Sequence, residues 1–487
     1  MVGITGILIS LGLLIYLAYR GISALIVAPL MALVAVLFSA DPVILGSYTQ
    51  IFMPALGKFA ILYFPLFLLG AIFGKLMDDS GSAGVIAQRI VETLGKNRSI
   101  LAIVLACAIL TYGGVSLFVV AFAVYPIAVA MFQEANIPKR LIPATIALGA
   151  FTFTMTALPG TPAIQNAIPM PYFNTTPFAA PFIGIIGGTT MFVLGMLWLS
   201  YREKGARKKG EGFGDTHEEA QRPEISKNIR EHAQCENFDV MEISPDDPTY
   251  VKKLPNFTIA VLPVILVILI NFLFTRFVIP AMETDFLALE KYGSTNINAV
   301  RGVWSIISAL VISIVILIFL NLKNFRSIKR TLDDGASASV LPLFNTASLV
   351  GFGAVIASLP AFELIRDMVL SIAPGNPLIS LSIAVNMLAG ITGSASGGMS
   401  IALQTLGDTY MELAISAGIN PELMHRVTSI ATGGLDALPQ NGAVITLLTI
   451  CKLTHRESYG DIFVVGALVP ILSLIVVLIL GTLFGSF

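Results

Sequence analysis

The stretch ALPGTPA at residues 157–163 lies inside a long apolar run, and a related stretch, ALPQNGA, recurs 280 residues later at 437–443. Proline removes a backbone donor and clashes with the preceding helical turn, and glycine loosens the backbone, so we expect a helix to break at both places. In a bilayer, a broken backbone persists only where it is buried in protein or lines a polar cavity. Paired breaks in the two halves of a chain are typical of a transporter's substrate site.

The composition indicates an all-α polytopic membrane protein. Of the 487 residues 55% are hydrophobic and only 12% are charged, and many apolar runs are long enough to cross a bilayer of about 30 Å. The first apolar run has no basic leader and no small-residue cleavage site, so it reads as a first span rather than a signal peptide. The three cysteines and four histidines are scattered, and neither a metal site nor a cofactor is expected. Nothing indicates nucleic-acid binding.

The order of predicted elements is the same in the two halves. In the first half we expect spans at 3–19, 22–38 and 52–77, an amphipathic surface helix at 83–94, a re-entrant hairpin at 99–132, a broken helix at 141–168 and a closing span at 178–201. In the second half we expect spans at 256–280, 301–320 and 336–359, an amphipathic surface helix within 360–374, a hairpin at 378–415, a broken helix at 427–450 and a closing span at 461–484. The domains are therefore repeats at 1–201 and 256–487, joined by a charged linker at 202–255.

Five spans per half require the two repeats to be inverted, and the charge distribution fixes their orientation. With the linker in the cytoplasm, 23 of the 29 Lys and Arg residues fall on the cytoplasmic side. The six on the other side are Lys58, Arg276, Lys291, Arg301, Arg366 and Arg426. Both termini are then expected outside, the first hairpin opens from the cytoplasm and the second opens from the exterior.

Several short motifs resemble the gluconate permease (GntP-type) family of the ion transporter superfamily. They are LGAIFGKLMDDSG at 69–81, ANIP at 135–138, NPL at 376–378, GSA at 393–395 and GINPELM at 418–424. The resemblance covers nearly the whole chain. It implies proton-coupled transport of small hydroxy-carboxylates across a bacterial inner membrane, by a homodimer whose transport domain moves in an elevator motion against a scaffold.

The chain departs from that family's pattern at the proposed site. Members of the family tend to carry a Glu near the first hairpin tip and His residues around the first break, where this chain has Gly113-Gly114 and the sequence MTALP at 155–159. The less polar surroundings favour a smaller, less hydroxylated acid than gluconate, for example 3-hydroxybutyrate.

No Lys or Arg lies inside the predicted broken helices or hairpin arms, so we expect neutral donors to hold a carboxylate. Helix N-termini at the breaks and tips offer free backbone N–H groups and a partial positive charge. The candidate substrate-binding residues lie at the tips and breaks: Gly113, Gly114, Ser116, Gly160, Thr161, Gln165, Asn166, Ser394, Ser396, Gly397, Gly398, Gln440, Asn441 and Gly442. For any single Ser or Thr, a helix cap or an interhelical hydrogen bond is the competing interpretation.

Two acidic residues are candidates for proton coupling. Asp436 directly precedes the second break, where the first half has Thr156, and Asp408 lies on the far arm of the second hairpin. An ionisable group at membrane depth is a functional hypothesis by default. The alternative for Asp436 is that it accepts hydrogen bonds from backbone amides freed by the break, and the alternative for Asp408 is that it caps or braces the hairpin.

Other functional classes fit the sequence less well. An enzyme would need a nucleophile with its base, or a metal cluster, at depth, and a channel would need a continuous pore. Sodium coupling remains an alternative to proton coupling, because Ser hydroxyls and free carbonyls at hairpin tips also suit a cation.

The charge distribution generates a prediction about topology. A reporter enzyme that is active only outside the cytoplasm should be active when fused after Asp285 or at Phe487, and inactive when fused after Gly210. Activity at Gly210, with equal fusion protein in all three strains, would reverse the orientation and the side on which each hairpin opens.

Overall fold

The computed structural model describes residues 2–20, 22–39, 42–214, 243, 253–439 and 441–486. These residues form helices and turns and contain no β-strand. Within them, seven helical segments are long and apolar enough to cross a membrane, or eight if the bent pair α5 and α6 is one span. The chain is therefore an all-α polytopic membrane protein, as the sequence predicts.

The helices of the first half begin and end close to the expected ranges. They are α1 (Val2–Tyr19), α2 (Ala24–Leu37), α3 (Ile44–Ser47) continuing through a π-helical turn into α4 (Met53–Asp79), α5 (Ser82–Leu94), α6 (Ser99–Tyr112), α7 (Leu117–Glu134), α8 (Ile142–Ala150), α9 (Phe153–Thr156), α10 (Ile164–Ala167), α11 (Pro169–Phe173) and α12 (Pro181–Lys208). The region predicted as one broken helix is thus divided into short pieces on both sides of residues 157–163.

The second half follows the same order. It contains α14 (Phe257–Leu273), α15 (Ile297–Leu320), α16 (Ile328–Ser358), α17 (Phe362–Leu370), α18 (Pro377–Thr392), α19 (Ala395–Ser416), α20 (Pro421–Ala431), the 3₁₀ turn η10 (Leu435–Ala437), α21 (Gly442–Ile450), α22 (His455–Phe463) and α23 (Val469–Phe484). Helix α20 begins six residues before the expected start at 427, because Asn420 caps it and Pro421 occupies its first turn. Most of the linker lies outside the described residues.

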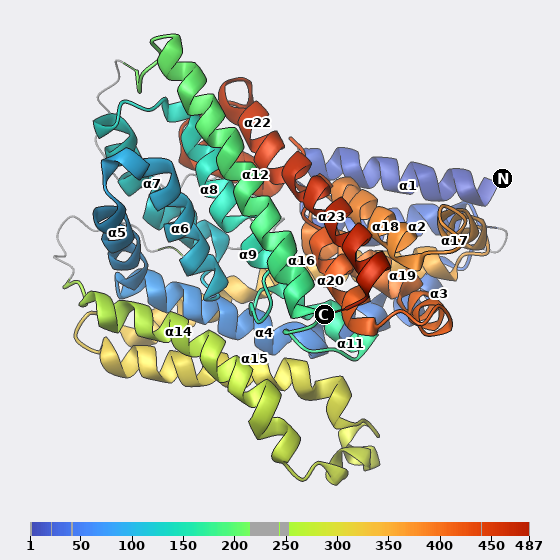
Figure 1. Ribbon diagram of the computed structural model, residues 1–487. Helices are drawn as coiled ribbons and strands as arrows, with labels where there is room; N and C mark the ends of the chain where they lie inside the picture. The colour runs from blue at the N-terminus through green and yellow to red at the C-terminus, as the bar shows by residue number, and fades with distance from the viewer. Residues whose placement is uncertain are drawn as a thin grey trace.

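The two halves pack into one body rather than side by side. Helix α4 of the first half packs along α16 of the second, α15 also contacts α4, and α12 packs against α23. In Figure 1, α14 and α15 lie beside α4, while α8 and α12 lie next to α22. Contacts between distant parts of the chain therefore bring the two breaks into one region.

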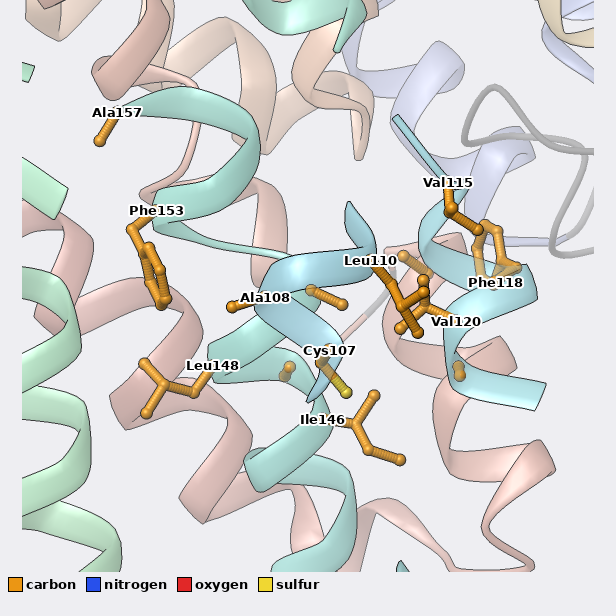
Figure 2. Close-up of a cluster of buried hydrophobic side chains, with 14 of the residues drawn as sticks. Cys107, Ala108, Leu110, Val115, Phe118, Val120, Ile146, Leu148, Phe153 and Ala157 are labelled. Atoms are coloured by element: carbon orange, nitrogen blue, oxygen red, sulfur yellow. The ribbon is translucent and has the colours of Figure 1, made fainter. Parts of the chain in front are cut away.

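The first hairpin and the first broken helix share an apolar core. Figure 2 shows Cys107 and Leu110 of α6, Phe118 of α7 and Leu148 of α8 within this cluster, with Phe153 of α9 beside them. All these side chains are buried. Dispersion contacts between them hold α6 to α9 together as one packed unit.

The two predicted surface helices differ from each other. The apolar face of α5 is buried, with Ile86 and Ala87 fully covered, and α5 contacts α6, α7 and α14. Its amphipathic pattern therefore reflects packing on protein. By contrast, none of the α17 residues is buried, and Leu364 and Met368 are exposed, which fits a helix at a membrane surface.

A cluster of charges ties the ends of three helices together. Arg140, before α8, donates to Asp461 of α22 (2.9 Å) and forms a bidentate pair with Glu211 (2.6 and 3.0 Å), while Nη2 of Arg202 in α12 donates to Asp461 as well (3.2 Å). The Arg140 hydrogen bonds hold the pKa of the Glu211 carboxyl below its ordinary value. Since Asp461 is buried and paired twice, this cluster joins the first half to the second.

The close approach of α18 and α19 generates a prediction. A Cβ atom at Gly398 would overlap the backbone of Ala389, whereas a Cβ at Gly12 in α1 would meet no atom within 4 Å. Relieving this overlap requires the backbones of α18 and α19 to move apart, so Gly398→Ala should destabilise the protein by about 1–3 kcal/mol. Gly12→Ala should change the stability by less than about 0.5 kcal/mol. Thermal unfolding of both variants in the same detergent measures the difference, and equal stability would show that the arms separate without cost.

Candidate functional site

Hydrogen bonds satisfy the backbone of the first break. Gly160 has a φ of +81°, a conformation that favours glycine, and its N–H donates to the carbonyl of Pro177 (2.8 Å). Its own carbonyl accepts from the side-chain amide of Asn271 in α14 (2.9 Å), and the carbonyl of Pro159 accepts from the hydroxyl of Tyr112 (2.6 Å). The break is therefore held by the hairpin tip and by a helix of the second half.

Asn166 spans the same break from inside. Its Nδ2 donates to the carbonyls of Thr161 and Pro177, both at 3.0 Å, and its Oδ1 accepts from Arg426 (3.1 Å) and lies 3.2 Å from Nε2 of His425. All these groups are buried. Both amide atoms of Asn166 are thus engaged with the protein, so this residue positions the break rather than offering a free group to a ligand.

Arg426 is the residue that the sequence interpretation misplaced. It was expected in a polar segment outside the membrane, but it lies in α20 with 0% of its surface exposed. Its guanidinium donates to the carbonyls of Ala179 (2.9 and 3.1 Å), Pro177 (3.4 Å) and Thr156 (3.5 Å) as well as to Asn166. It forms no ion pair with the acidic residues that the structure describes.

A buried cation therefore lies directly behind the first break, although Arg426 lines neither of the two cavities described below. A local signal could have found it. Asn420, Pro421 and Glu422 form a helix start, with an N-cap, a proline in the first turn and an acid near the positive end of the helix. That signal extends the helix back by more than one turn and includes Arg426.

The second break is held by asparagines. Oδ1 of Asn441 accepts from the N–H groups of Ala443 (2.7 Å) and Val444 (3.1 Å), which caps α21, and its Nδ2 donates to the carbonyl of Gly393 at the hairpin tip (2.9 Å). Asn386 of α18 accepts from the N–H of Leu435 (2.9 Å). Gly442 is buried at the start of α21. Gln440 lies outside the described residues.

Most of the predicted tip residues serve packing and capping. Ser394 caps α19 by accepting from the N–H of Gly397 (3.2 Å), and its hydroxyl lies 3.4 Å from that of Ser396. Gly397 faces Leu349 of α16, and Gly113 faces Val264 of α14 so closely that a Cβ would overlap that side chain. These contacts favour the structural interpretation for the second tip.

A cavity of about 120 Å³ lies between the first tip, the first break and the helices α4, α15 and α16. Of the predicted residues, Gly114, Ser116 and Gln165 line it, as do Thr111 and Met155. A smaller cavity of about 30 Å³ lies between the two breaks and is lined by Gln165, Met155, Asp436 and Asn441, among others. Three residues, Leu117, Met155 and Gln165, line both cavities.

The two candidate coupling acids lie in different environments. Asp436 lines the smaller cavity, where its carboxylate accepts from the N–H groups of its own backbone and of Ala437. Asp408 is exposed on the surface of α19 and lines neither cavity. The structure therefore places Asp436 with Gln165 and Asn441, and separates Asp408 from them.

No protein-family model matches the chain. The chain is 46% identical over 465 residues, covering 94% of both sequences, to a protein of Bacillus subtilis (strain 168) named "Uncharacterized transporter YxjC". The chain belongs to this transporter family. Its fold is also similar to that of MtrF from Neisseria gonorrhoeae, described as one of a class of antimetabolite efflux pumps, with a TM-score of 0.52 at 13% identity over 92% of this chain and 85% of that one.

Membership of this family makes the chain a multi-pass membrane transporter, which agrees with the helical architecture. At 13% identity the likeness to MtrF concerns the fold alone, because one fold carries many functions. The substrate and the coupling ion depend on the residues of the site.

The contacts of Arg426 generate a prediction. Lysine keeps the charge, but its single ammonium cannot reach acceptors on both sides of a guanidinium, so Arg426→Lys leaves buried carbonyls unpaired. It should lower the free energy of unfolding by roughly 2 kcal/mol or more. The matched control is Arg98→Lys, at an exposed position before α6. The unfolding temperature in detergent measures the effect of each substitution. If Arg426→Lys unfolds at the same temperature as Arg98→Lys and the parent, the guanidinium of Arg426 has no structural role.

Proposed function

We propose that this chain is a secondary active transporter for small hydroxy-carboxylates such as 3-hydroxybutyrate or gluconate, driven by proton symport and working by an elevator-type alternating-access mechanism. The observation that carries the proposal is the position of the two cavities. They share the lining residues Leu117, Met155 and Gln165, and the larger one lies between the first hairpin tip and the helices α4, α15 and α16. A substrate site at the boundary between two helix groups suits a transport domain that slides along a scaffold.

Two features support an anionic substrate. The N-terminus of α7 borders the larger cavity through Val115, Ser116 and Leu117, so the backbone amides and the dipole of an 18-residue helix lie at one end of it. In addition, Arg426 is a buried positive charge whose hydrogen-bond partners among the described residues are all neutral. It donates to the carbonyl of Thr156, a residue that lines the smaller cavity. A carboxylate is attracted by both.

Asp436 supports coupling to a cation. Keeping a carboxylate charged and unpaired at membrane depth costs free energy, because the charge is removed from water. Asp436 therefore favours binding a proton or a metal cation. Binding would neutralise the cavity wall before a substrate anion enters, and release on the other side would restore the charge. Proton coupling is the proposal, and sodium coupling is its alternative.

The resemblance to gluconate permeases adds the proposed setting. It supports a homodimer in a bacterial inner membrane, with the charged linker in the cytoplasm. The two hairpins and the two broken helices would then move as one block.

Transport into liposomes tests the proposal. Purified protein should concentrate labelled 3-hydroxybutyrate when an inward proton gradient is imposed, and unlabelled hydroxy acids should compete while glucose should not. Accumulation under a sodium gradient alone would assign sodium as the driving ion. Equal competition by glucose, or flux that never builds a gradient, would contradict a carboxylate symporter.

Replacing Asp436 by Asn separates coupling from binding. The amide keeps the shape and some hydrogen bonding but cannot take up a proton, so Asp436→Asn should still exchange labelled for unlabelled substrate while losing proton-driven accumulation, by at least about tenfold. The control is Asp367→Asn, at an exposed position on α17. If Asp436→Asn accumulates substrate like the parent, Asp408→Asn tests the second candidate.

A further inference from the structure

Two buried polar atoms, on residues that line the larger cavity, have no hydrogen-bond partner among the described residues. They are Oε1 of Gln165, on α10, and Oγ1 of Thr111, in the last turn of α6. The two residues are only 4% and 3% exposed. A buried polar atom without a partner is costly, so each marks a place where a bound molecule can supply the missing hydrogen bond.

The backbone of Gln165 is fixed from the other half of the chain. Its carbonyl accepts from the hydroxyl of Ser429 in α20 (3.0 Å), and the residue lines both cavities. The neighbouring Asn166 uses both of its amide atoms within the protein. Of this adjacent pair, Gln165 is therefore the residue whose side chain is available to a ligand.

The opposite wall of the cavity is apolar. Helices α4, α15 and α16 contribute Leu66, Phe67, Leu310 and Pro342, and the one hydroxyl among their lining residues, on Ser339, already donates to the carbonyl of Ala336 (2.7 Å). A ligand in this cavity therefore meets polar groups on one side and hydrocarbon on the other. Hydroxyls placed against the hydrocarbon would lose their bonds to water without replacement.

We propose that the larger cavity selects short acids that carry a single hydroxyl on an alkyl chain, with Gln165 and Thr111 binding that hydroxyl. This inference rests on the proposed function and narrows its substrate class. The substrate hydroxyl donates to Oε1 of Gln165 and accepts from the hydroxyl of Thr111, the two roles that one hydroxyl can fill together. The carboxylate lies toward the N-terminus of α7, and the alkyl chain lies on the wall formed by α4, α15 and α16. Gluconate would place several hydroxyls on that wall.

Substrate exchange in liposomes measures this selectivity without depending on the coupling ion. The full-length protein is reconstituted with unlabelled 3-hydroxybutyrate inside, and entry of labelled 3-hydroxybutyrate is measured against rising external 3-hydroxybutyrate, butyrate or gluconate. We expect 3-hydroxybutyrate to compete at least roughly tenfold better than butyrate or gluconate. Butyrate has no hydroxyl to pair with Gln165, and gluconate has hydroxyls that would remain unpaired against the apolar wall.

Two near-isosteric variants test the assigned residues. Gln165→Met and Thr111→Val remove the hydrogen-bonding atoms at nearly constant volume, and each should reduce the preference for 3-hydroxybutyrate over butyrate to within about threefold while butyrate competes as well as before. The control is Gln88→Met, at an exposed position on α5, which should leave the preference unchanged. Thermal unfolding in detergent establishes that each variant is folded.

The outcomes distinguish this inference from the proposed function. If gluconate competes as well as 3-hydroxybutyrate, or if both Gln165→Met and Thr111→Val keep the parent's preference, the selection of single-hydroxyl acids is wrong while carboxylate transport stands. If the parent exchanges none of the three acids, carboxylate transport itself is contradicted. A loss of preference in either variant, with the control unchanged, supports the assignment.

Discussion

The whole arrangement depends on one constraint: a backbone broken inside a membrane has to find hydrogen-bond partners within the protein. At the first break, Tyr112, Asn271, Asn166 and Arg426 supply those partners, and they come from four different helices of both halves. The break can therefore exist only in the assembled fold. This requirement binds α6, α14 and α20 around residues 157–163, and a cavity lined by the end of α6 and by residues 162–165 lies beside them.

The two breaks share a sequence pattern but carry opposite chemistry. Behind the first lies the buried cation Arg426, held by carbonyl groups, and beside the second lies the carboxylate of Asp436. An intramembrane cation attracts a substrate anion, and an intramembrane acid attracts a proton or a metal cation. For the proposed function, the difference between the two breaks at these positions provides the charge asymmetry that a symporter of anions needs.

The comparisons and the site contribute different parts of the functional argument. Similarity to YxjC makes the chain a transporter, and similarity to MtrF concerns the architecture alone. The proposed substrate class rests on the cavity walls, because Gln165 and Thr111 carry unpaired polar atoms while the lining residues of α4, α15 and α16 are largely apolar. A wall of this kind discriminates by the number and position of hydroxyl groups more than by charge.

The sequence by itself determined the positions of the helices, the two breaks and the hairpin tips, because apolar runs, prolines, glycines and helix caps act over a few neighbouring residues. Only the tertiary structure decided which polar residues are available. Gln165 and Asn166 are adjacent and chemically alike. The side-chain amide of Asn166 is fully hydrogen-bonded to Arg426 and to carbonyls of the break, whereas Gln165 lines both cavities. Arg426 was expected outside the membrane and is fully buried. The partners that decide these roles lie up to 270 residues away in the chain, where no local pattern reaches, so burial and hydrogen bonding at the site are properties of the packed fold.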